Sequence, residues 1–130
     1  MINVIKIGGN VVDDPIALND FMADFAALPG KKILVHGGGK EATALSKALG
    51  IETTMIDGRR VTDAKTLDVV TMVYAGLINK RIVSLLQKNS VDAIGLCGAD
   101  AHALVSRKRS AQPVDYGFVG DVDGTGVNVG

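Results

Sequence analysis

Apolar residues near the start of the chain alternate between strand-like runs and helical spacing. Runs at residues 2–7 and 32–36 have the length of buried strands, and each precedes a segment whose apolar residues recur every three or four positions. Asp14 introduces the first segment as an N-cap, with proline at the first helical position. The second segment, residues 42–49, ends at Gly50, which suits the position after a helix. This order predicts a parallel sheet with helical crossovers.

The middle of the chain predicts a hairpin followed by a long helix. Asp57-Gly58 lies between two extended segments and is a strong hairpin signal. Thr62-Asp63 can cap a helical stretch that reaches residue 88, in which a break near residues 76–79 is expected. Its apolar positions exceed one buried stripe. Residues 63–88 therefore suggest either a subunit interface, which would make a homodimer, or deep burial.

The last third of the chain reads as further strands. Residues 91–97 and 104–106 are apolar enough for two more strands, residues 116–122 alternate like a third, and residues 123–126 form a turn. Taken together, the patterns predict an α/β fold with an open, mainly parallel sheet, flanking helices and a β-hairpin.

Composition excludes several classes of partner. Lys+Arg and Asp+Glu number 14 each, so no excess charge points to nucleic acid or to a membrane surface. The single cysteine, Cys97, cannot form an internal disulfide, and no signal segment or apolar run of membrane-spanning length is apparent. A cytoplasmic protein is expected. No cluster of metal-ligating residues stands out, so no metal site is assigned to this chain.

Two glycine-rich turns follow the first two strands. Gly8-Gly9 and Gly37-Gly38-Gly39 each stand between a strand and a helix, where backbone N–H groups can approach an anion. The doublet is equally well explained as a tight connection, whereas the triplet favours a ligand cradle. Neither turn has the spacing of a P-loop or of a dinucleotide site. One anion-binding crevice formed by both turns is the prediction.

Four motifs give this chain a family resemblance. They are Lys6-x-Gly8-Gly9, His36-Gly37-Gly38-Gly39, Gly58-Arg59-Arg60-Val61-Thr62 and Gly117-Phe118-Val119-Gly120-Asp121-Val122. In this order they resemble the amino acid kinase family over essentially the whole chain. Family members are considerably longer. The resemblance therefore implies that residues 1–130 form the N-terminal, acyl-amino-acid-binding lobe, and that the C-terminal nucleotide-binding lobe is absent from this chain.

The resemblance also implies a reaction and a set of site residues. The reaction is ATP-dependent phosphorylation of the γ-carboxylate of an N-acylglutamate, a step of arginine biosynthesis, with ATP and Mg²⁺ bound mostly by the missing half. The implied roles are Lys6 as the catalytic residue, Gly8 and Gly9 as phosphate-binding residues, and Gly38, Gly39 and Arg60 as substrate-binding residues. Arg60 is chosen over Arg59 by resemblance. The alternative, two solvated hairpin arginines, stays open.

A carboxylate nucleophile limits what else the site needs. It is ionised at neutral pH, so no general base is required. His36 is therefore expected to hold the glycine turn, and His102 to lie in a loop. Three alternatives remain: a non-catalytic amino-acid-binding or regulatory domain, a half whose partner is a separate polypeptide, and a family member that acts on a different carboxylate or on carbamate.

Overall fold

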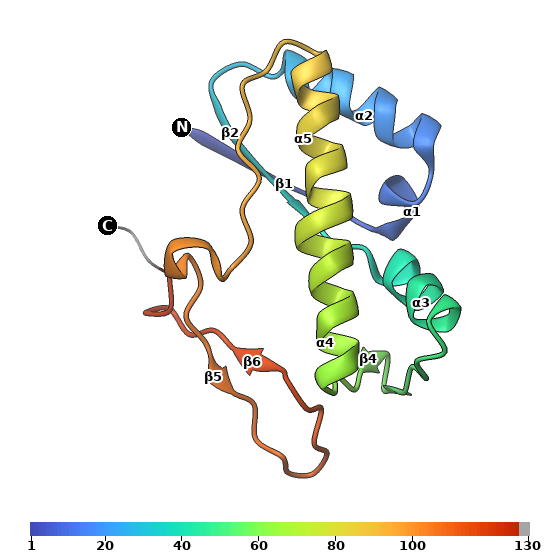
Figure 1. The fold of residues 1–130 in the computed structure, drawn as a ribbon. Coiled ribbons are helices and arrows are strands. Elements are labelled where there is room, and N and C mark those ends of the chain that lie inside the picture. Colours follow the sequence, from blue (N-terminus) through green and yellow to red (C-terminus); the bar gives the residue numbers. More distant parts are fainter. Residues whose placement is uncertain (128–130) are drawn as a thin grey trace.

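Two parallel strands crossed by a long helix form the frame of the molecule (Figure 1). The computed structural model describes residues 1–127. Strand β1 (Ile2–Ile7) pairs in parallel with β2 (Lys31–His36), in a register that sets Ile2 opposite Lys31 and Ile7 opposite His36. Helix α2 (Pro15–Ala27) is the crossover between them. The α/β fold with a parallel sheet and flanking helices is therefore confirmed.

The other elements are short apart from the long helix. The helices are α1 (Gly9–Val12), α3 (Gly39–Ala48), α4 (Ala64–Thr71), the π-helical segment η1 (Met72–Ile78), α5 (Asn79–Lys88) and the 3-10 turn η2 (Asp100–His102). The strands are β3 (Met55–Ile56), β4 (Arg59–Arg60), β5 (Arg107–Lys108) and β6 (Gly120–Asp121). β3 pairs with β4, and β5 pairs with β6, each antiparallel.

The start of α2, the end of α3 and the hairpin turn lie where the local sequence predicted them. The Asp14 carboxylate accepts hydrogen bonds from the backbone N–H groups of Ile16 and Ala17 at 2.9 and 3.1 Å, which caps α2. Gly50 follows α3 with a φ of +68°, a conformation that favours glycine. Asp57 and Gly58 both have positive φ, as the two central residues of a type I′ hairpin require.

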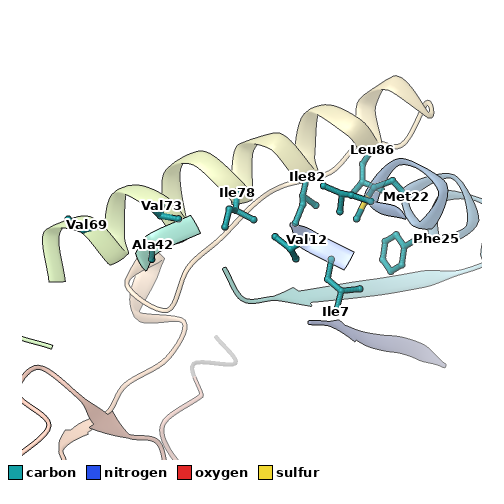
Figure 2. Packing of buried hydrophobic residues seen from close by; sticks show 11 residues of the cluster. Ile7, Val12, Met22, Phe25, Ala42, Val69, Val73, Ile78, Ile82 and Leu86 are labelled. Atoms are coloured by element: carbon teal, nitrogen blue, oxygen red, sulfur yellow. The ribbon is translucent and has the colours of Figure 1, made fainter. Parts of the chain in front are cut away.

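The core lies between one face of the β1–β2 sheet and the helices α2 and α5 (Figure 2). Its sheet side is Ile7, with Ile5 and Leu34 partly buried beside it. The helices supply the remaining buried side chains, namely Val12, Leu18, Met22, Phe25, Ala42, Val69, Val73, Ile78, Ile82 and Leu86. The core thus covers only one face of the sheet.

The long helix corrects one prediction. No break occurs near residues 76–79: α4, η1 and α5 follow one another without a gap, and seven residues between them are π-helical. The wider turn of a π-helix accommodates the extra residue that the apolar pattern suggested as a break. By length and composition alone, the helix Ala64–Lys88 could also cross a membrane, whereas the sequence analysis found no apolar run of that length. A core helix passes the same test, and this one buries Val73, Ile78 and Ile82 in the hydrophobic core.

The last third contains two further corrections. Residues 91–97 join no strand ladder within the part of the chain that the structure describes, although their exposure alternates. They are held instead by helix contacts, such as the bond from the N–H of Val91 to the carbonyl of Leu86 at 3.0 Å. The strand predicted at 104–106 is displaced to Arg107–Lys108. Of residues 116–122, only Gly120–Asp121 is a strand, while Gly117 forms an isolated bridge with Thr62.

Candidate functional site

Both glycine turns lie at one edge of the β1–β2 sheet. The register that places Ile7 opposite His36 brings together the carboxyl ends of the two parallel strands. α1 follows β1 after Gly8, and α3 follows β2 with Gly38 as its N-cap. The first backbone N–H groups of a helix have no partner within the helix, so both turns can offer donors at this edge.

Lys6 lies one residue before the end of β1. It pairs with Val35 in the sheet register, and its side chain is exposed. Because side chains alternate along a strand, Lys6 lies on the face opposite buried Ile7. The ammonium group is thus positioned at the carboxyl edge of the sheet on its uncovered side.

The three glycines of the second turn are not equivalent. A Cβ on Gly38 would lie 2.1 Å from Cδ1 of Ile78 and 3.1 Å from Cδ1 of Tyr74, so glycine is required there for packing against η1. A Cβ on Gly37 would meet nothing within 4 Å, and one on Gly39 would lie 3.8 Å from the Tyr74 hydroxyl oxygen. Gly38, one of the three glycines that favoured the prediction of a ligand site, is therefore explained by packing.

His36 is tied to the second turn, as expected. Its Nδ1 donates to the carbonyl of Gly37 at 3.0 Å, which leaves Nε2 to accept from the side-chain amide of Asn79 at 3.5 Å. Asn79 is buried and also donates to the carbonyl of Leu96 at 3.3 Å. Sequence reasoning missed Asn79, because a single polar residue in an apolar helix gives no local signal of its distant partners.

Arg60 reaches the second glycine turn from the hairpin. Its guanidinium donates to the carbonyl of Gly39 at 3.1 Å and to the Thr43 hydroxyl at 2.8 Å. A third hydrogen bond, to the Thr53 hydroxyl, measures 3.3 Å. All three acceptors are uncharged. Among the described residues Arg60 forms no ion pair, so its positive charge stays available to an anionic ligand.

A link between the two turns was also missed. Nζ of Lys40, the residue after Gly39, lies 3.5 Å from Oδ2 of Asp13. Asp13 directly follows α1, and its Oδ2 would lie 3.1 Å from a Cβ on Gly9. Neither carboxylate oxygen of Asp13 has a hydrogen-bond partner among residues 1–127. The Asp13–Lys40 pair therefore joins the end of α1 to the start of α3 through charge alone.

A cavity of about 340 Å³ adjoins Arg60. Its walls are formed by Arg59, Arg60, Thr62, Val70, Tyr74, Arg109, Tyr116 and Val119. Arg109 is already engaged: a hydrogen bond to Asp121 raises the pKa of Arg109 and lowers that of Asp121. Arg59 and Arg60 therefore remain as the cations that can bind an anion in this cavity. Tyr74 connects the cavity to the second turn, because it also packs against Gly38.

The motif at Gly117 has a structural role in this region. Gly117 has a φ of +74°, and a Cβ there would lie 2.2 Å from the carbonyl oxygen of Thr62. The backbone N–H of Thr62 donates to the carbonyl of Tyr116 at 2.9 Å, and the N–H of Phe118 donates to the carbonyl of Thr62 at 2.7 Å. Glycine at this position therefore brings the tail segment against the hairpin and completes the cavity wall.

The model of the amino acid kinase family matches residues 1–125. The chain belongs to this family. Within it, the chain is 62% identical to the acetylglutamate kinase of Cytophaga hutchinsonii over 120 residues, which are 92% of this chain and 46% of that protein. It is 57% identical to the acetylglutamate kinase of Phocaeicola vulgatus, covering 94% of this chain and 48% of that protein. The chain thus spans about half the length of the curated relatives it matches.

Solved structures share the fold. Protein smu.665 of Streptococcus mutans superposes with a TM-score of 0.73 at 25% identity, covering 94% of this chain and 49% of that one. The N-acetylglutamate synthase of Neisseria gonorrhoeae, in complex with coenzyme A and N-acetyl-glutamate, gives a TM-score of 0.70 at 25% identity. The match covers 92% of this chain and 27% of that one. The resemblance inferred from the four motifs is thereby confirmed at the level of the family.

Proposed function

We propose that this chain is the amino-acid-binding half of an acetylglutamate kinase, which phosphorylates the γ-carboxylate of N-acetylglutamate with ATP. The observation that carries the proposal is the position of Arg60, which bonds to the Gly39 carbonyl and lines the adjoining cavity. An arginine fork next to backbone N–H donors suits a ligand with two carboxylates. The 62% identity to a named acetylglutamate kinase supports the same substrate.

Arg60 binds the α-carboxylate of the substrate in this account. Its guanidinium is held by neutral oxygen acceptors, so the bound carboxylate supplies the missing negative charge. Gly38 and Gly39, at the start of α3, orient the acyl-glutamate through their backbone. Tyr74 and Val70 give the cavity an apolar side that suits a short acyl group.

Lys6 stabilises negative charge on the transferring phosphoryl group. Phosphoryl transfer is accelerated mainly by positioning and by cations that neutralise the developing charge. Lys6 stands at the carboxyl edge of β1, directly before the Gly8-Gly9 turn, whose N–H groups provide further donors for phosphate oxygens. The γ-carboxylate attacks as an ionised nucleophile, so no residue has to remove a proton.

The nucleotide and its metal ion belong to the remaining half of the enzyme. The described residues contain no group of three or more His, Cys, Asp or Glu side chains that could hold a metal ion. Mg²⁺ in such enzymes is held by one or two carboxylates together with the phosphates of the nucleotide, so we assign it to the half that binds ATP and derive no step through it here. Bound ATP supplies the phosphoryl group, and this chain supplies Lys6 and the glycine turns.

We also propose that the whole enzyme is a homodimer in which α4, η1 and α5 form the contact. Met72 and Leu77 are apolar and half exposed on this helix. They are five residues apart, which is the hydrogen-bond spacing of a π-helix, and so lie about one turn apart on the same side. The second interpretation of the apolar excess, deep burial, accounts for Val73 and Ile78 but not for these two.

A non-catalytic or synthase-linked role is the second candidate. The likeness to N-acetylglutamate synthase shows that a domain of this fold also occurs within a protein of a different activity. The identity to that protein is 25%, against 62% for the kinase of Cytophaga hutchinsonii, which favours the kinase.

The test joins this chain to the unmatched half of the Cytophaga hutchinsonii kinase, and the product is called the joined enzyme below. The joined enzyme is incubated with MgATP and a panel of acylated glutamates, and acyl phosphate is trapped with hydroxylamine. Turnover of N-acetylglutamate, above that of N-succinylglutamate and of glutamate, is expected. A joined enzyme that folds and binds N-acetylglutamate without phosphorylating it would favour the binding domain.

A further inference from the structure

One face of the β1–β2 sheet is apolar and uncovered. On the side away from the core, Ile2, Val4, Ile33 and Val35 are exposed to 55%, 64%, 51% and 44%. The register places Val4 beside Ile33, so the four side chains form one patch, called here the apolar sheet face. Parallel sheets are almost always covered on both faces, and a contiguous exposed apolar patch marks an interaction site.

The segment after α5 extends this surface. Ala93 packs against the core, and a Cβ on Gly95 would lie 2.0 Å from Oδ1 of Asn79, so both residues face α5. Ile94 and Leu96 alternate with them and are exposed to 85% and 62%. These large side chains therefore also point away from α5, on the side where the sheet lacks a covering layer.

Two lysines border the apolar sheet face. Lys31 pairs with Ile2 at the start of the strands, and Lys6 pairs with Val35 at their end. Neither forms an ion pair among the described residues. A second copy of this chain stacked on the patch would bring like charges together at its edges, which is unfavourable. The occupant should instead be apolar over the four aliphatic side chains and carry negative charge beside Lys6.

We infer that the apolar sheet face is the docking surface for the remaining half of the kinase, whose helices form the missing layer. The curated relatives are about twice as long as the matched region, so a second half of similar size is available to cover it. The identity of this occupant rests on the proposed function. Docking there would bring a phosphate-bearing half to the edge where Lys6 stands, so the same contact would complete the core and the active site.

The test co-expresses this 130-residue chain with the unmatched half of the Cytophaga hutchinsonii kinase as a separate polypeptide. Sedimentation velocity should show a one-to-one complex. Val4→Glu and Ile33→Glu, at the central pair of the patch, each bury an unpaired carboxylate on docking and should weaken the complex by at least about tenfold. Ile16→Glu is the matched control, because Ile16 is 75% exposed on α2, outside the patch, and should leave the complex unchanged.

A second measurement uses the free chain. Binding of the dye ANS to the wild-type chain should fall when the second half is added, and Val4→Glu and Ile33→Glu should bind less dye from the start. Complexes unaffected by both substitutions would overturn the inference. So would a free chain that self-associates through the patch, and loses self-association with Val4→Glu, without binding the second half. A complex that depends on the patch but transfers no phosphoryl group would contradict the proposed function alone.

Discussion

The guanidinium of Arg60 donates a hydrogen bond of 3.1 Å to the carbonyl oxygen of Gly39, although 21 residues separate them in sequence. The hairpin and the second glycine turn thereby become parts of one site. Arg60 also lines the adjoining cavity, whereas the motif alone could not show that it reaches the glycines.

Replacing Arg60 should mainly weaken the amino-acid substrate. In the joined enzyme, Arg60→Ala removes a charged hydrogen-bonding partner worth about 1.5–3 kcal/mol, so KM for N-acetylglutamate should rise by about tenfold to a hundredfold. KM for ATP should stay near its original value. Arg59→Ala, which removes the exposed neighbour, is the comparison measured in parallel. A larger effect from Arg59 than from Arg60 would reverse the assignment.

Lys6 should act on turnover rather than on substrate binding. Lys6→Ala in the joined enzyme is expected to lower kcat by on the order of a hundredfold or more with little change in KM for N-acetylglutamate, because its charge is needed mainly in the transition state. Lys31→Ala is the control, since Lys31 lies on the same sheet face at the opposite end. Retention of most of the kcat in Lys6→Ala would remove it from the catalytic machinery.

Alanine substitutions at Gly38 and Gly37 should differ in their effect on the free energy of unfolding. Gly38→Ala forces a Cβ against Ile78 and Tyr74 in a buried position, which should lower the free energy of unfolding by about 1–3 kcal/mol. Gly37→Ala meets nothing within 4 Å and should leave stability nearly unchanged. Urea denaturation of both variants tests this. Equal stability of the two variants would mean that the turn is not packed against η1 as described.

Charged substitutions at Met72 and Leu77 should dissociate the proposed homodimer. Light scattering on the joined enzyme at micromolar concentration is expected to give a dimer, and Met72→Glu and Leu77→Glu a monomer. Ile16→Glu, at an exposed position on α2 outside this helix, is the control. Val73 cannot serve in this test, because it is buried in the core and a charge there would unfold the protein. A wild-type monomer, or a dimer insensitive to both variants, would refute this interface.

The elements predicted from sequence were those with strong local signals. Asp14 caps α2 through its own carboxylate, and Asp57-Gly58 adopts the positive φ values that its residue types favour. These interactions involve residues two or three positions apart, so a short window of sequence contains all of their chemistry.

The remaining features depend on distant partners. Residues 91–97 have the composition of a strand, but a ladder needs a neighbouring strand, and the described residues provide contacts to α5 instead. The packing of Gly38 on Ile78 joins residues 40 positions apart, and the contact of His36 with Asn79 joins residues 43 apart. No local pattern distinguishes such a glycine from one that binds a ligand.

The central claim is a division of labour in which this chain binds the amino-acid substrate and the remaining half binds the nucleotide. The most direct measurement is a calorimetric titration of the 130-residue chain with MgATP. Because the cavity beside Arg60 is assigned to the amino-acid substrate and the nucleotide to the remaining half, the account predicts no binding in the micromolar range. Binding of MgATP at low-micromolar concentration would place the nucleotide site in this chain and contradict the account.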